Sequence, residues 1–245
     1  MTAFIALTLF ALLVHSPVVK IVSALHREVV LQALVLSLRT TLVCAVVIVI
    51  VGTPLAALLA RPFAGRAAVE TLITLPIVLP PVVAGLALLL AFGRAGLLGK
   101  ALAVFGLELP FTTAAVVLAQ IFVAAPLYII AAKDAFARAD PDWTDAAATL
   151  GASPAYVFMR IIMPPAFPAL LSGLALASAR ALGEFGATIT FAGNLPGVTQ
   201  TMPVAVYMAA QGDMDSSIAI AVVMLAISYG ALLGVRLLGS GWGRR

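Results

Sequence analysis

Two charged side chains within an apolar stretch are the first candidates for chemistry in this sequence. Arg180 and Glu184 lie four residues apart, and Thr188 follows at the same spacing. Residues with this spacing share one face of an α-helix, so the arginine and the glutamate are close enough to pair. Ionisable groups at membrane depth are costly unless they are paired or hydrated. Two interpretations stay open: these three residues lie beside a translocation path, or the ion pair fixes the rotation of the helix.

Catalysis and metal binding need side chains that this sequence does not bring together. His15 and His26 are far in sequence from Glu184, and no Gly-x-Ser-x-Gly or His-Glu-x-x-His pattern occurs. Cys44 is the single cysteine, which excludes a multi-cysteine metal site and a disulfide framework. The chain also has no phosphate-binding Gly-x-x-x-x-Gly-Lys-Ser/Thr loop. We therefore predict no catalytic residue, no metal site and no cofactor in this chain.

The composition predicts an integral membrane protein. Hydrophobic residues make up 63% and charged residues 10% of 245 residues, with a mean hydropathy of +1.17. Soluble domains average about 25% charged residues. The formal net charge is +4, but in a membrane protein the placement of Lys and Arg reports orientation. The sequence therefore favours an all-α membrane protein with the lipid bilayer as its surroundings, and it does not indicate nucleic-acid binding.

Apolar windows predict six membrane-spanning helices, since each window approaches the roughly 20 residues that a crossing needs. They cover residues 3–24, 34–60, 71–92, 111–132, 166–191 and 218–238. The first contains His15-Ser16-Pro17, and a cleaved signal peptide is the competing interpretation. It lacks a basic start and a small-residue cleavage site, so we predict a retained helix that Pro17 can kink. Pro76, Pro80 and Pro81 predict a break in the third window, either at the membrane surface or beside a cavity.

Six crossings place both termini and the polar segment 140–165 on one side of the membrane. The distribution of the 14 basic residues supports a cytoplasmic position for that side. Arg180 lies within a predicted span, and the far side carries Lys20, Arg27, Arg39, Arg94 and Lys100. The side of the polar segment carries Arg61, Arg66, Lys133, Arg138, Arg160, Arg236, Arg244 and Arg245.

Helix signals recur within the polar segment 140–165. Asp140-Pro141 reads as an N-cap with proline at the first helical position, and Gly151 supplies a left-handed stop. Ser153-Pro154 repeats the start signal, so a second helix is predicted from Ala155 to about Ile162, ended by Pro164-Pro165. These signals alone fit either a connector between spans or a docking element.

The spacing in this segment resembles the EAA loop of ABC importer permeases, which docks on the ATPase subunit. The matching positions are Asp145, Ala146, Ala147, Gly151, Ile161, Met163 and Pro164. Asp145 stands where glutamate is usual and Met163 where leucine is usual, and both keep charge or bulk. The resemblance implies that the residues that couple this chain to an ATPase are Asp145, Ala146, Ala147, Gly151, Ala152, Ile161 and Pro164.

Further segments are similar to molybdate permeases and, more loosely, to sulfate permeases. They are residues 179–188 with Phe191-Ala192-Gly193-Asn194 and residues 199–203, and residues 75–85 with Phe92-Gly93-Arg94. The resemblance extends from about Leu34 to the C-terminus. It implies the type I ABC importer fold, with residues 1–33 as an N-terminal transmembrane helix and external loop and 34–245 as the transmembrane domain.

The same resemblance implies a set of partners and a location. The chain is expected to pair with a second copy of itself and with two cytoplasmic ATPase subunits, which bind ATP and Mg. An external binding protein would deliver molybdate or tungstate, and the assembly would lie in a bacterial or archaeal inner membrane. A sulfate-type permease is one alternative. An ion-coupled secondary transporter is another, although the sequence shows no convincing inverted repeat.

Overall fold

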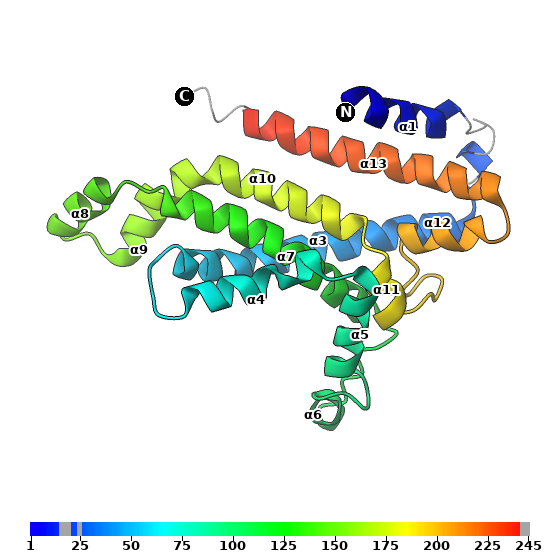
Figure 1. Cartoon of the computed structure of the whole chain (residues 1–245), viewed down its shortest axis with the longest axis horizontal. Coiled ribbons are helices and arrows are strands. Elements are labelled where there is room, and N and C mark those ends of the chain that lie inside the picture. The colour runs from blue at the N-terminus through cyan, green and yellow to red at the C-terminus, as the bar shows by residue number, and fades with distance from the viewer. Residues whose placement is uncertain (15–20, 24–25, 241–245) are drawn as a thin grey trace.

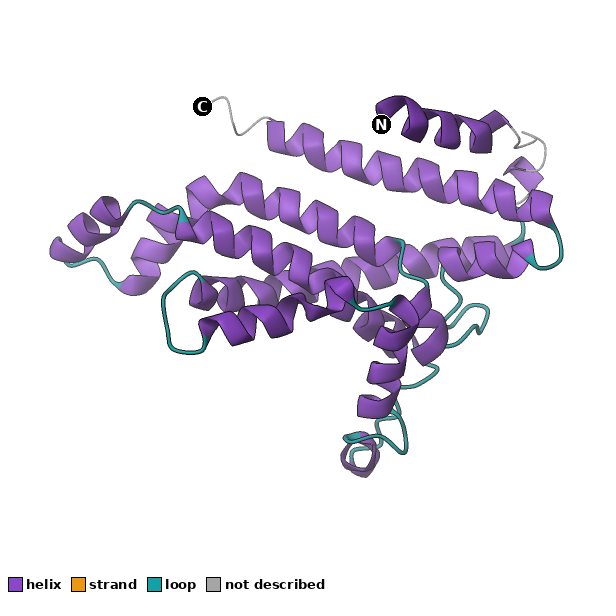
Figure 2. Ribbon diagram, in the orientation of Figure 1, coloured by secondary structure: helices purple, strands orange, loops and turns teal. Residues whose placement is uncertain are grey.

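The computed structural model describes the backbone of residues 1–14, 21–23 and 26–240, and all of its regular elements are helices (Figure 2). This confirms the predicted all-α class. In chain order they are α1 (Thr2–Val14), α3 (Glu28–Leu59), α4 (Arg66–Val78), α5 (Pro81–Phe92), α6 (Gly99–Val104), α7 (Thr113–Ala137), α8 (Pro141–Thr149), α9 (Pro154–Val157), a π-helical turn η1 (Phe158–Ile162), α10 (Met163–Leu182), α11 (Gly186–Phe191), α12 (Met202–Ala210) and α13 (Met214–Ser240).

The long helices α3, α7, α10 and α13 run alongside one another and form the bundle (Figure 1). The loop between α3 and α4 lies at the end of the bundle that carries α8, and α13 runs towards that end. The arm formed by α5 and α6 projects sideways from the bundle. This arrangement agrees with the prediction that the segment 140–165 and the C-terminal helix end on one side.

Fewer of the described helices are long and apolar enough to span a membrane than the six that the sequence predicts. Among the described residues, the helices 28–59, 113–137 and 154–182 are long and apolar enough to cross a bilayer, and α4 with α5 forms a further, bent candidate. The apolar helix α1 has 13 residues, and the predicted interruption at residues 15–17 lies outside the described residues. Six crossings therefore stay a prediction.

The helix that follows Ser153 does not end at Pro164-Pro165, so this part of the sequence prediction was wrong. Residues 154–182 form one helical span of 29 residues. Within it, the N–H of Met163 donates to the carbonyl of Phe158, five residues back, which is the bond of a π-turn. The wider turn starts α10 anew, so the prolines occupy its first turn, where their missing N–H groups cost little.

The predicted fifth span is also interrupted, because α10 ends at Leu182 and α11 begins at Gly186. Gly183 lowers the helical propensity at this point. The Glu184 side chain then accepts a hydrogen bond from the N–H of Ala187, which satisfies an amide at the start of α11. The predicted break in the third span is confirmed: α4 ends at Val78, α5 begins at Pro81, and the chain bends by 119° between them.

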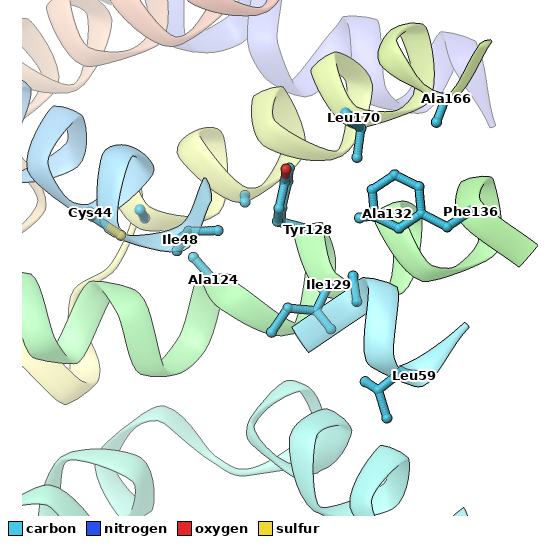
Figure 3. Close-up of a cluster of buried hydrophobic side chains, with 13 residues drawn as sticks. Cys44, Ile48, Leu59, Ala124, Tyr128, Ile129, Ala132, Phe136, Ala166 and Leu170 are labelled. Carbon is cyan, nitrogen blue, oxygen red and sulfur yellow. The ribbon is translucent and has the colours of Figure 1, made fainter. Parts of the chain in front are cut away.

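Small residues let α10 approach α7 closely, as the recurrence of Gly173, Ala177 and Ala181 predicts. All three are buried, and a Cβ placed on Gly173 would lie 2.7 Å from the Cβ of Ala131. Beside this contact, Tyr128 of α7 lies in the largest core cluster and points towards α10 (Figure 3). Its hydroxyl is 2.7 Å from the Thr53 hydroxyl on α3. The close helix contact and this partly buried hydrogen bond hold α3, α7 and α10 together.

Candidate functional site

The segment 140–165 begins with the helix that its capping residues predict. The Asp140 carboxylate accepts a hydrogen bond of 3.0 Å from the N–H of Asp142, and Pro141 is the first residue of α8. This side-chain cap satisfies one of the amides that have no partner within the helix. No residue of α8 is buried. The helix therefore protrudes from the bundle, with most of its surface exposed and only Thr144 and Ala147 half-buried.

Gly151 makes the elbow between α8 and α9. Its φ is +83°, its N–H donates to the carbonyl of Ala148 at 2.9 Å, and the N–H of Ala152 donates to Ala147 at 3.0 Å. These two bonds form a Schellman motif, which needs a left-handed residue at the position of Gly151. The Ser153 hydroxyl then accepts from the N–H of Tyr156 at 3.3 Å and starts the next helix. The predicted left-handed stop is confirmed.

The surface of this segment carries large apolar side chains that the bundle does not cover. Trp143 is 66% exposed and Leu150 is 88% exposed. Asp145 and Ala146 are exposed beside them, and Gly151 is exposed at the elbow. Apolar side chains gathered on a protruding segment are typical of a protein contact surface. The structure thus brings the first five predicted coupling residues together in α8 and the elbow, while Ile161 lies in η1 and Pro164 in the first turn of α10.

The helical span that follows the elbow packs against the membrane bundle at its start. The rings of Phe136 on α7 and Phe158 on η1 meet edge to face, with centroids 5.3 Å apart. Beyond η1 the helix continues to Leu182, at the other end of α10. One helical span, with the π-turn η1 within it, therefore leads from the elbow to the break before α11.

Arg180 and Glu184 pair as predicted, although the helix that was expected to carry both ends between them. The Nη1 atom of Arg180 lies 2.6 Å from Oε2 of Glu184, and the exposed fractions of the two side chains are 36% and 1%. The other carboxylate oxygen, Oε1, accepts from the N–H of Ala187 at 2.8 Å. Both oxygens of one buried carboxylate are thus occupied, one by each of the two helices. The arginine charge is neutralised from within the protein.

Thr188 belongs to α11 and is fully buried, with no hydrogen-bond partner for its hydroxyl. Of the three residues predicted beside a translocation path, Arg180 is therefore the one with an accessible side chain. Gln120 was not among the predicted site residues, yet it donates from Nε2 to the carbonyl of Ala181 at 3.2 Å. A single amide side chain within an apolar span is the sequence signal that could have indicated this contact.

The two broken spans meet at their breaks. A Cβ on Gly186, the first residue of α11, would lie 2.4 Å from the Cβ of Pro81, the first residue of α5. A Cβ on Gly85 would lie 2.6 Å from the Cβ of Thr190. The backbones of α5 and α11 are therefore in direct contact, and Figure 1 shows them side by side. Irregular backbone within a membrane protein persists where protein buries it or where it lines a cavity.

Comparison with known proteins identifies a family. The family described as "Binding-protein-dependent transport system inner membrane component" matches residues 48–242. The molybdenum transport system permease protein ModB of Mycobacterium bovis is 46% identical over 205 residues, which cover 83% of this chain and 77% of that protein. A probable sulfate transport system permease protein of Nephroselmis olivacea is 32% identical over 216 residues, covering 87% of this chain and 76% of that protein.

A solved structure has the same fold. The chain superposes on a structure of inward-facing conformations of the MetNI methionine ABC transporter with a TM-score of 0.69 and 15% identity, covering 87% of this chain and 96% of that one. At this identity the likeness speaks for the fold alone. The fold is thus that of a type I ABC importer membrane subunit, as the resemblance of the loop implies. From the extent of the family match, the chain belongs to the binding-protein-dependent transport system inner membrane components.

Proposed function

We propose that this chain is the permease subunit of an ATP-driven importer for molybdate or tungstate, which an external binding protein delivers. The substrate assignment rests on the 46% identity to a molybdenum permease over most of the chain. The 32% identity to a probable sulfate permease makes sulfate the weaker alternative. The chain serves as a transport subunit and not as an enzyme, because this family's members are transport components.

The broken helices support a transport path in this region. A tetrahedral dianion is too costly to move bare through hydrocarbon, so it needs a hydrated cavity. Substrate sites of transporters are commonly built where membrane helices are discontinuous. In this chain the breaks after α4 and after α10 lie against each other, with Pro81 packed on Gly186. We infer that two copies of the chain enclose the path, each contributing one such junction.

The segment 140–165 is the proposed receiver of energy from ATP. The segment exposes the apolar side chains of Trp143 and Leu150 beside the Schellman elbow at Gly151. This apolar surface is available for contact with a partner protein. Two cytoplasmic ATPase subunits would bind ATP and Mg, and each would contact the segment 140–165 of one copy of the chain. The coupling contacts are assigned to Asp145, Ala146, Ala147, Gly151, Ala152, Ile161 and Pro164.

The path itself is proposed to hold the oxyanion weakly. Arg180 is the accessible member of the set that also contains Glu184 and Thr188, and Glu184 already pairs with it. A high-affinity dianion site needs converging cations or many amide donors. Weak binding also favours release, because a path must let its ion leave. Substrate choice therefore falls to the external protein, and the transmembrane domain at residues 34–245, which contains the whole family match, supplies the route.

ATP hydrolysis by the assembled complex tests this function. The complex of the chain with its ATPase is reconstituted in lipid, and hydrolysis is followed while the binding protein is added with molybdate, tungstate or sulfate. We expect the loaded binding protein to stimulate hydrolysis with molybdate and tungstate. Equal stimulation by sulfate would favour the sulfate alternative. If no ATPase copurifies with the chain and transport is driven by an ion gradient, the chain is a secondary transporter.

A further inference from the structure

We propose that Glu184 is a positioning residue that fastens α11 to the end of α10, so that movement of the segment 140–165 reaches the α5–α11 pair. This inference rests on the proposed function, because it concerns how the chain uses energy received at that segment. It assigns to Glu184 a role in coupling and not in contact with the transported anion.

The first step is transmission of movement along the helical span 154–182, called the lever below. Residues 154–182 form one helix of 29 residues that starts at the elbow and ends at the break. The close contact of Gly173 with Ala131 and the ring contact of Phe136 with Phe158 hold it against α7. Because these contacts hold the span against α7 both at the π-turn η1 and beyond it, a shift of the elbow is proposed to move Leu182 as well.

The second step is the fastening across the break. The Glu184 carboxylate binds Arg180 on α10 through Oε2 and the N–H of Ala187 on α11 through Oε1. Both bonds involve a charged group, which makes each stronger than a neutral hydrogen bond. Their geometry constrains the angle between the two helices. Without this carboxylate, α11 would stay connected to α10 through the backbone of residues 183–185, which is outside regular helix.

The third step is the close packing of α11 against α5. The contacts of Gly186 with Pro81 and of Gly85 with Thr190 leave no room for a further methyl group between the two helices. The α5–α11 pair therefore turns together when α11 turns. Glu184 stands between this pair and the lever, and its 1% exposed side chain places it out of reach of a solvated anion in this conformation.

A purely structural ion pair would behave differently. If the pair only fixed the rotation of α10, its loss would lower the amount or the stability of the protein, and each remaining complex would keep the normal ratio of ATP hydrolysed to oxyanion imported. A fastening that transmits movement predicts a rise in that ratio. The ratio is therefore the readout that separates the two roles.

The experiment measures this ratio for the complete complex with ATPase and binding protein in proteoliposomes, using labelled molybdate. For Glu184→Ala we expect continued hydrolysis with uptake reduced about tenfold or more, since the loss of even one hydrogen bond to a charged group has an effect of that order. Glu184→Gln keeps an acceptor for Ala187, and Arg180→Gln keeps the carboxylate, so both should give intermediate ratios. The matched control is Glu108→Ala, which removes an exposed ion pair of 2.6 Å with Arg94 and should leave the ratio unchanged.

A ratio equal to wild type in both Glu184→Gln and Arg180→Gln, at measurable uptake, would overturn the inference. These two variants decide the matter if Glu184→Ala fails to reach the membrane. The proposed function fails in a different way: a wild-type complex that imports no oxyanion would overturn it, and the inference with it, before any variant is compared.

Discussion

Replacement of Gly151 tests whether the elbow of the segment 140–165 is functional. Its φ of +83° lies in the left-handed region, and a Cβ placed there would meet nothing within 4 Å. A side chain therefore fits in space, and the cost is that of the backbone alone, roughly 1–2 kcal/mol for a residue other than glycine. A cost of this size lowers the population of the elbow conformation about 5- to 30-fold.

We expect Gly151→Val to stay in the membrane, because the elbow lies outside the core clusters. Docking of the ATPase should weaken and uptake should fall by a similar factor, about 5- to 30-fold, since the Schellman bonds at Ala147 and Ala148 set the angle of α8 in fewer molecules. Gly151→Asn should retain most activity, because asparagine tolerates the left-handed region. The assay is copurification of the ATPase with the tagged permease, together with oxyanion uptake at matched membrane levels.

Wild-type transport by a well-expressed Gly151→Val protein would show that the elbow is only a connector. An equal loss of activity in Gly151→Asn and Gly151→Val would contradict the backbone argument in another way. It would mean that any side chain at this position obstructs the ATPase, whatever its preferred φ.

Further predictions concern packing, a partly buried hydrogen bond and topology. Gly173→Val should destabilise the complex by about 1–3 kcal/mol, because its Cβ meets that of Ala131, and an unchanged midpoint of thermal inactivation would argue against the close α7–α10 contact. Tyr128→Phe should cost about 1 kcal/mol through loss of the bond to Thr53, which the same thermal assay measures against wild type. A cysteine introduced by Ser153→Cys should be labelled from the cytoplasm, and labelling from outside in intact cells would reverse the topology.

The parts of the site that the sequence predicts are those set by local chemistry. The Asp140 cap and the Gly151 stop depend on residues within one or two helical turns, and the structure contains both. The Arg180–Glu184 pair was also predictable, because the spacing brings the two side chains within reach on a helix or just past its end. Small residues on α10 indicated the close contact with α7 for the same reason.

What could not be predicted depends on a local change of helix type and on contacts between distant segments. Pro164 and Pro165 read as a helix stop, but the π-turn before them places both in a first turn, where proline is tolerated. The break before α11 was missed because Glu184 was assigned to a continuous helix. Its partner at Ala187 and the contact of Gly186 with Pro81 become visible only once the two broken spans are packed together.

Uptake of labelled molybdate into proteoliposomes tests the central claim most directly. The vesicles carry the permease with its ATPase, ATP is enclosed with the ATPase domains, and loaded binding protein is added outside. The proposed function predicts accumulation that requires both ATP hydrolysis and binding protein, that tungstate inhibits, and that excess sulfate leaves largely unchanged. Accumulation that proceeds without ATP under an ion gradient, or that sulfate blocks as well as tungstate does, would contradict it.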